Sequence, residues 1–286
     1  MENNEFKIQN GVLEKYQGIG GDVTIPDNVT KIGDSAFYDC TSLTSITIPD
    51  SVTEIGDRAF VCCTDLTSII IPDSVIRIGH FAFSDCIGLT SITIPDSVTD
   101  IGNAVFAGCT DLTEIIVAGN NPKYHSAGNC LIETQSKKLI AGCKTSKIPA
   151  DGSVTKIGAY AFDGCTDLTS ITIPDSITKI DEYAFLFCTD LTSIFIPNSV
   201  TEIGDGAFSC CTGLTSITIL DNINEIGDNV FEDCITIPNS ITKIMVDAFD
   251  DSCKDLTIRC VKGSFASRYA ADNSIPFKAV NTEDEL

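Results

Sequence analysis

The side chains best suited to catalysis or metal binding in this chain are its 14 cysteines and two histidines. Thiolates act as nucleophiles and metal ligands, and histidine transfers protons near neutral pH. No C-x-x-C pair occurs, and His80 stands where other copies of a repeated segment carry Asp57 and Asp205, which indicates a surface position. His125 lies in an irregular stretch beside Tyr124. The sequence therefore predicts no metal site, no cofactor and no enzyme.

Eight of the cysteines recur in one phase of the repeated segment, which indicates a packing role. Free cysteine packs as a small buried hydrophobe, and many free thiols fit a reducing compartment. Same-phase cysteines on stacked coils would lie about 4.8 Å apart with parallel side chains, whereas a disulfide needs Cβ atoms about 3.8 Å apart. We expect a ladder of reduced thiols in preference to disulfides, formed by Cys40, Cys63, Cys86, Cys109, Cys165, Cys188, Cys211 and Cys234.

A second column holds acidic and amide residues that follow the repeated Ile-Pro pair or its equivalent. Calcium binding is one interpretation, because Ca²⁺ takes several oxygen ligands. The G-G-x-G-x-D signature of calcium-binding solenoids is missing, however, and Asp followed by Ser is ordinary turn chemistry. We expect turn capping at these positions, which are Asp27, Asp50, Asp73, Asp96, Asp175, Asn198, Asp221 and Asn239.

A repeat of 23 residues must position all of these side chains. Ile48-Pro49, Ile71-Pro72 and Ile94-Pro95 keep this step, and Ile173-Pro174 and Ile196-Pro197 resume it after an interruption. A fixed short period predicts a solenoid, in which each coil can bury its apolar face only against its neighbours.

Within one coil, Leu66, Ile69 and Ile71 match a strand with inward-pointing side chains. Pro72 ends that strand because it lacks an N–H group. Gly79 allows a corner, and the segment after it is expected to form a short helical turn. Phenylalanine recurs once per coil and predicts a buried column of Phe37, Phe60, Phe83, Phe106, Phe162, Phe185, Phe208, Phe231 and Phe249.

The full pattern C-x-x-L-x-x-I-x-I-P-x-S-V/I-x-x-I-G-x-x-A-F resembles the BspA-type leucine-rich repeat from about Gly21 to Val280. The resemblance implies a right-handed leucine-rich-repeat solenoid. One short parallel strand per coil would form a concave sheet, with turns and short helical turns on the convex side. It also implies an adhesion or interaction role, since family members are often surface or secreted proteins that bind host or matrix proteins.

We expect four segments along the chain. Residues 1–20 form a hairpin cap that turns at Asn10-Gly11. Residues 21–260 form the solenoid, with an irregular insert at 118–148 that is either a variant repeat or a binding feature. Residues 261–280 form a C-terminal cap, and residues 281–286 form an acidic tail.

The concave sheet is the usual binding face of a solenoid, and here small hydroxyls would dominate it. The leading hypothesis is a non-enzymatic module that binds a protein or glycan there, with the isoleucines and phenylalanine of that face as anchors. The alternatives are a structural spacer or assembly scaffold, and ice binding through the Ser/Thr-x-Thr rows. The candidate positions are Ser45, Thr47, Ser68, Ile70, Ser91, Thr93, Glu114, Ile116, Ser170, Thr172, Ser193, Phe195, Ser216 and Thr218.

Charge and hydropathy narrow the range of partners. Lys plus Arg is 18 against 40 for Asp plus Glu, and the net charge of −22 repels nucleic acid and anionic lipid. No segment approaches the roughly 20 apolar residues of a membrane-spanning helix, and the first residues lack the features of a signal peptide. A cytoplasmic location is the default expectation, and the family resemblance implies the cell surface or secretion. The sequence leaves the ligand and the oligomeric state open.

Overall fold

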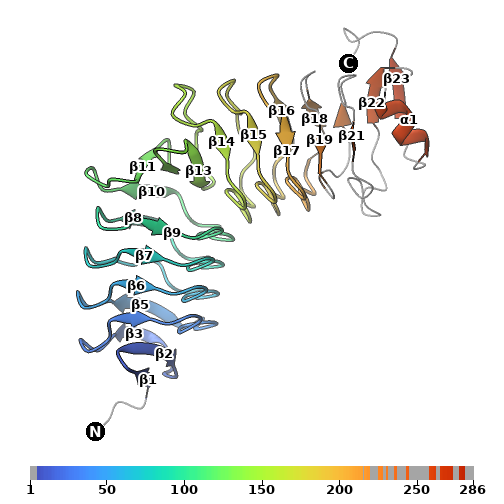
Figure 1. Ribbon diagram of the computed structural model, residues 1–286. Helices are drawn as coiled ribbons and strands as arrows, with labels where there is room; N and C mark the ends of the chain where they lie inside the picture. Colours follow the sequence, from blue (N-terminus) through green and yellow to red (C-terminus); the bar gives the residue numbers. More distant parts are fainter. Residues whose placement is uncertain are drawn as a thin grey trace. The chain divides into compact units, whose positions relative to one another are not determined.

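The computed structural model describes residues 5–214, 216–219, 225–227, 230, 235–236, 243–244, 258–261, 265–272 and 277–280. The described strands build the stacked coils of a solenoid (Figure 1), which confirms the predicted leucine-rich-repeat solenoid with parallel strands. The chain divides into two compact units. Unit 1 comprises Met1–Ser136 and Ile140–Ser146, and unit 2 comprises Lys137–Leu139 and Lys147–Leu286.

Unit 1 contains both short and long strands. One sheet has the order β1-β2-β4-β6-β7-β9, antiparallel between β1 and β2 and parallel elsewhere, and we call it the short-strand sheet because β4, β6, β7 and β9 have two residues each. The long strands pair as β3 with β5 and β8 with β10, in parallel. Their bounds are β1 Phe6–Gln9, β2 Val12–Tyr16, β3 Gly21–Thr24, β4 Lys31–Ile32, β5 Leu43–Thr47, β6 Glu54–Ile55, β7 Arg77–Ile78, β8 Ser91–Ile94, β9 Asp100–Ile101, β10 Glu114–Val117, β11 Tyr124–Ala127 and β12 Cys130–Glu133.

Unit 2 repeats this arrangement. In its short-strand sheet β13, β14, β15, β17, β19 and β21 follow in that order, and in the other sheet β16, β18, β20, β22 and β23. Helix α1, Phe265–Asp272, is the single α-helix among the described residues. The strand bounds are β13 Lys138–Ala141, β14 Lys156–Ile157, β15 Lys179–Ile180, β16 Ser193–Ile196, β17 Glu202–Ile203, β18 Ser216–Ile219, β19 Glu225–Ile226, β20 Ile235–Thr236, β21 Lys243–Ile244, β22 Ile258–Val261 and β23 Phe277–Val280.

The prediction of one strand per coil is wrong, because a coil can contribute two. The long strand was predicted from its alternating Leu and Ile residues and is present as β5, β8 and β10, but the segment with Leu66, Ile69 and Ile71 that was predicted as such a strand is not one in the structure. The second strand has only two residues, such as Arg77–Ile78, and pairs in register with Glu54–Ile55 and Asp100–Ile101 of the neighbouring coils. Two residues are too few to show a period of two, so alternation in the sequence cannot reveal this strand.

The predicted short helical turn is also wrong, because this side of the coil is a run of tight turns. The Phe60 N–H donates to the Ala82 carbonyl of the next coil at 2.8 Å, whereas the Val61 N–H donates to the Arg58 carbonyl at 3.3 Å. Alternate N–H groups therefore serve the neighbouring coil and cannot take part in a helix. The alternation requires left-handed backbone at Arg58 (φ 55°) and Cys62 (φ 60°).

The core contains the predicted phenylalanine column. In unit 1 the rings of Phe37 and Phe60 stack 5.0 Å apart with their planes at 11°, and Phe60 and Phe83 stack at 5.4 Å and 5°. In unit 2 Phe162 and Phe185 stack 5.0 Å apart at 1°. These offset, nearly parallel rings bury large apolar area and fix the spacing of the coils. Phe231 and Phe249 lie outside the described residues.

Buried thiols bridge successive coils beside these rings. The Cys63 thiol donates to the Phe37 carbonyl at 3.2 Å, Cys86 donates to Phe60 at 3.1 Å, and the series continues in both units. The Cys86 thiol and burial together raise the pKa of Cys63 far above its usual range. Each thiol stays protonated and donates a hydrogen bond to a carbonyl, which matches the packing role predicted for this ladder. Cys234 lies outside the described residues.

The region predicted as an N-terminal cap contains the β1–β2 hairpin, which turns at Asn10 (φ 51°) and Gly11 (φ 77°). Tyr16 of this hairpin stacks on Phe37 at 5.1 Å and so covers the first ring of the column. The region predicted as a C-terminal cap contains α1 and β23. The predicted acidic tail, residues 281–286, lies outside the described residues.

Within unit 1, the insert supplies side chains to backbone groups that another coil would otherwise satisfy. The Tyr124 hydroxyl accepts from the Ile101 N–H at 3.1 Å, and the Ser126 hydroxyl accepts from the Val117 N–H at 3.0 Å. The Asn121 amide donates to the Val98 carbonyl at 2.9 Å, and the Thr145 hydroxyl donates to the Thr113 carbonyl at 2.6 Å. Such pairing closes the exposed edges of β9 and β10.

Candidate functional site

In unit 1 eight of the candidate residues point outward, six of them from β5, β8 and β10 and two, Ser68 and Ile70, from a segment that is not a strand, and we call this surface the serine–threonine face. Alternation along each strand buries Ile46, Ile92 and Ile115 and turns their neighbours outward. Parallel pairing then aligns equivalent residues, so that Glu114 lies opposite Ser91 and Ile116 opposite Thr93. The eight residues are Ser45, Thr47, Ser68, Ile70, Ser91, Thr93, Glu114 and Ile116, all of them exposed or half-buried.

The polar part of this face has an ionised residue that was not predicted. Asp22 lies opposite Ser45, whose hydroxyl donates to its carboxylate at 2.7 Å, and Thr44 donates at 3.1 Å. These hydrogen bonds, Ser45 foremost, hold the pKa of Asp22 below its usual range. The sequence could have identified Asp22, because it stands one repeat before Ser45 and replaces the serine of its own coil. The serine row thus begins at Asp22 and ends at Glu114.

Apolar side chains interrupt the neighbouring row. Ile70 is 82% exposed and Ile116 is 40% exposed. The same repeat position holds Thr24, Thr47 and Thr93 in the other coils of unit 1. With Thr93 between them, the two isoleucines are two coils apart, or roughly 10 Å at the usual strand spacing.

In unit 2 the corresponding candidates Ser170, Thr172, Ser193 and Phe195 are all exposed. Phe195 is the apolar one, with 51% of its surface exposed. The backbone of Ser216 and Thr218 pairs in register with Ser193 and Phe195. Four of the predicted residues of unit 2 are therefore aligned in the β16–β18 pair at the level of the backbone, whereas Ser170 and Thr172 lie in a segment that is not a strand.

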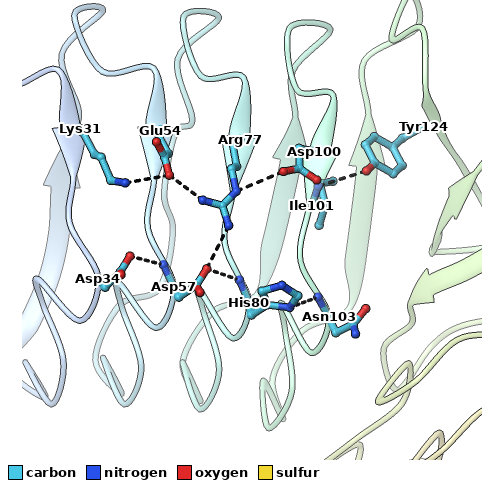
Figure 2. A network of polar contacts seen from close by, with 10 residues as sticks. All are labelled: Lys31, Asp34, Glu54, Asp57, Arg77, His80, Asp100, Ile101, Asn103 and Tyr124. Carbon is cyan, nitrogen blue, oxygen red and sulfur yellow. Dashed lines mark hydrogen bonds and ion pairs between the residues drawn. The ribbon is translucent and has the colours of Figure 1, made fainter.

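The short-strand sheet of unit 1 carries a charge network that sequence reasoning missed (Figure 2). Lys31, Glu54, Arg77 and Asp100 occupy the same register position in β4, β6, β7 and β9, with alternating sign. Glu54 lies 2.9 Å from Lys31 and 2.7 Å from Arg77, which also contacts Asp100 at 3.1 Å. Partial burial opposes ionisation of Glu54, but its two cationic partners outweigh burial and hold its pKa below the usual range.

His80 links neighbouring coils, whereas His125 makes its contact within the insert. The His80 N–H donates to Asp57 at 2.9 Å, and its Nδ1 accepts from the Asn103 N–H at 3.0 Å (Figure 2). His125 Nδ1 lies 2.9 Å from the Thr134 hydroxyl. The first histidine thus fills the turn position that Asp34 and Asp57 fill in earlier coils, where each accepts from the next coil.

Two features are absent from the described residues. No group of three or more His, Cys, Asp or Glu side chains among them could hold a metal ion. Within the described part of the chain, no helix has the length and apolar character needed to cross a membrane.

Comparison with solved structures gives several leucine-rich-repeat proteins. A leucine-rich cell surface protein from Faecalibacterium prausnitzii is 27% identical, with a TM-score of 0.61 and 98% of each chain covered. A leucine-rich repeat protein from Bacteroides ovatus is 29% identical, with a TM-score of 0.58 and coverage of 94% of this chain and 64% of the other. One from Eubacterium ventriosum shares the fold, with 23% identity, a TM-score of 0.68 and coverage of 86% and 77%.

No curated protein sequence matches the chain. The family model for the BspA type leucine-rich repeat region matches residues 13–127 and 133–257, in six copies. These residues include the coils of both units and the strands that build the serine–threonine face. The chain therefore belongs to the BspA-type leucine-rich repeat family.

Proposed function

We propose that this protein is a non-enzymatic binding module that recognises a protein or glycan partner through the serine–threonine face. The observation that carries the proposal is the 82% exposure of Ile70 in the middle of that face. An isoleucine anchor surrounded by small hydroxyls is the arrangement of a binding hot spot, with an apolar centre and hydrogen-bonding groups around it.

The fold itself gives no reason for isoleucine at this position. Threonine fills it in the coils of Thr24, Thr47 and Thr93, which lie in β3, β5 and β8, whereas Ile70 lies outside the strands. Threonine also suits a strand, because it shares the β-branched shape. Ile70 and Ile116 thus add apolar surface that packing within the coil does not use. Contact with a partner removes that surface from water and is favourable by about 25 cal/mol per Å².

A structural relative of this chain supports a location at the cell surface, where the protein would meet such a partner. The Faecalibacterium prausnitzii relative, which covers 98% of this chain, is described as a leucine-rich cell surface protein. The proposal therefore includes a surface-exposed or exported role, with an adhesion-type contact to a protein or glycan.

Arrays of purified glycans and purified proteins test the proposal, probed with the wild-type chain, Ile70→Glu and Ile76→Glu. Ile76 belongs to the same coil and is 52% exposed, but it precedes β7 on the short-strand side. We expect array components that bind the wild type and Ile76→Glu. Their affinity for Ile70→Glu should be at least about tenfold lower, which is the effect of removing a hot-spot residue. Equal binding of the two variants to every component would refute the proposal.

A further inference from the structure

The short-strand sheet of unit 2 stacks three lysines in register. Lys156 of β14 lies opposite Lys138 of β13 on one side and opposite Lys179 of β15 on the other. Neighbouring strands lie about 4.8 Å apart, so the three side chains leave the sheet at that spacing. We call these three residues the lysine stack.

The equivalent position in unit 1 is built in the opposite way. Arg77 lies in register between Glu54 and Asp100 and contacts both, at 2.7 Å and 3.1 Å. In unit 2 the two flanking carboxylates are replaced by Lys138 and Lys179. Like charges directly opposite each other on a sheet are destabilising. The charges of alternating sign in unit 1 show that this fold accommodates opposite charges at these positions. The fold of the coil therefore does not require three lysines in register.

Carboxylates compensate only the outer members of the stack. Asp181 lies 3.5 Å from both Lys138 and Lys179, and Glu202 lies 3.0 Å from Lys179. Lys156 is exposed, and among the described residues no carboxylate lies within ion-pair distance of it. The centre of the stack is therefore an accessible ammonium group with a cation on either side.

We infer that the lysine stack binds a linear anionic polysaccharide whose carboxylate or sulfate groups follow the ladder from β13 to β15. Regularly spaced cations on adjacent strands fit a ligand that repeats its charge along a chain, because each further contact is made at high effective concentration. Lys156 is exposed and Lys138 and Lys179 are half-buried, so all three side chains reach solvent. A shallow hollow of about 150 Å³ beside it is lined by Lys179, Glu202, Ile203, Gly204, Asp205 and Gly227.

Nucleic acid fits this surface less well. A duplex carries about one charge per 1.7 Å of axis and is broad, so it would meet the acidic groups around the stack. Those groups include Asp181 and Glu202, within a chain of net charge −22. A single polysaccharide chain of lower charge density is repelled less strongly by those carboxylates. This inference concerns another sheet than the serine–threonine face and does not depend on the proposed function.

Binding measurements on the full chain test the inference with four probes: polygalacturonate, dextran sulfate, uncharged dextran and a short DNA duplex. We expect binding of polygalacturonate or dextran sulfate, which distinguishes carboxylated from sulfated ligands, and no binding of dextran. The binding should weaken as salt is raised, because the contacts are exposed. Absence of binding to both anionic polysaccharides, or tighter binding to the duplex, would overturn the inference.

Four variants locate the site. Lys156→Gln and Lys156→Glu should weaken binding at least about tenfold, since each removes the central cation. Lys31→Gln is the matched control, because Lys31 has the same place in its coil but is paired with Glu54. Equal effects of Lys156→Gln and Lys31→Gln would contradict the inference. Ile70→Glu should leave polysaccharide binding unchanged, which separates this test from that of the proposed function.

Lys156→Glu also has a readout that does not involve a ligand. It places a carboxylate between Lys138 and Lys179, and Glu202 follows Lys179 in register, so the charges alternate in sign as they do in unit 1. We expect its melting temperature to rise by about 1–3 °C, since unlike pairs replace like pairs. A higher melting temperature together with lost binding is the result expected of a position kept for a ligand. A lower melting temperature would show that Lys156 is needed for the fold.

Discussion

Each ladder residue in this protein meets nearly the same neighbours in every coil, so its chemistry is set by its place in the ladder. The thiol of Cys63 has a carbonyl acceptor in the coil before it, and the thiol of Cys86 has the same contact one coil further on. Cys40 begins the ladder and is half-buried. Its burial raises the pKa of the thiol to about 11.

Alkylation of Cys40 should therefore be slow at moderately alkaline pH. With a pKa of about 11, the thiolate fraction at pH 8 is about a hundredfold below that of an ordinary thiol, and only the thiolate reacts. We expect the rate of iodoacetamide modification, measured on the Cys40 peptide by mass spectrometry, to rise about tenfold per pH unit up to about pH 10. The same peptide in unfolded protein is the control. A native rate that levels off near pH 9 would disagree with this account.

A second residue-scale prediction concerns the left-handed turns. Cys62 has φ 60°, and the equivalent positions in other coils are Gly108 and Gly164, with φ 70° and 69°. Left-handed backbone costs an L-residue about 1–2 kcal/mol, while glycine loses roughly 0.5–1 kcal/mol of extra chain entropy on folding. We expect Cys62→Gly to stabilise the protein by about 0.5 kcal/mol in denaturant unfolding.

The adjacent Cys63→Gly variant is the control for that experiment. Cys63 is fully buried and its thiol donates to the Phe37 carbonyl, so its removal leaves a cavity and takes one of the two hydrogen bonds from that carbonyl, which also accepts from the Cys40 N–H. We expect a loss of about 2 kcal/mol or more. Similar losses in both variants would show that backbone conformation is not the determining factor at position 62.

At the scale of elements, the short strands of unit 1 are joined by charge as well as by backbone hydrogen bonds. Replacing Glu54 by Gln leaves Lys31 and Arg77 without their shared carboxylate. The pair is partly exposed, so we expect a loss of only about 0.5–1 kcal/mol at neutral pH. The Lys7–Glu14 pair of the β1–β2 hairpin is more exposed, and Glu14→Gln should have a smaller effect.

This stabilisation has a definite pH dependence. The pKa of Glu54 is lower in the folded protein than in the unfolded chain, so the folded state prefers the ionised form. Its contribution is therefore complete above the unfolded pKa of about 4.3 and is lost as pH falls through the folded value. The melting temperatures of wild type and Glu54→Gln should differ at pH 7 and converge in acid. A difference that persists in strong acid would contradict the assignment.

The elements also show what the sequence could and could not predict. The long strands, the phenylalanine column and the outward alignment of Ser91 with Glu114 follow from a period of two inside a period of 23. The two-residue strands could not be predicted, because two residues are too few to show an alternation. The stacked turns could not be predicted either, because Arg58 and Phe81 have left-handed backbone conformations although neither is glycine. Their conformation is imposed by hydrogen bonds to the next coil, which a single coil's sequence does not display.

The sequence could predict which residues form the serine–threonine face, but not how far each side chain is exposed to solvent. The repeat places Ile70 among threonines, but its 82% exposure is known only from the structure. The Lys31–Glu54–Arg77–Asp100 network and the lysine stack of unit 2 depend on the short strands being in register. Because those strands were not predicted, neither arrangement was foreseen.

At the scale of the whole molecule, the units carry different surfaces on one repeated framework. Unit 1 has a serine–threonine face with isoleucine anchors and a neutralised charge ladder, whereas unit 2 has an exposed lysine stack. The net charge of −22 keeps the remaining surface strongly acidic. In a repeat protein each coil needs only its neighbours for stability, which leaves outward side chains free to vary.

The most direct test of the central claim is the affinity of Ile70→Glu and Ile76→Glu for one partner found on the arrays, measured by biolayer interferometry. The two variants place the same charge in the same coil, on different sides. The account predicts that Ile70→Glu weakens binding by at least about tenfold, or 1.4 kcal/mol, while Ile76→Glu stays within about twofold of wild type. Equal affinities, or a greater loss with Ile76→Glu, would contradict binding through the serine–threonine face.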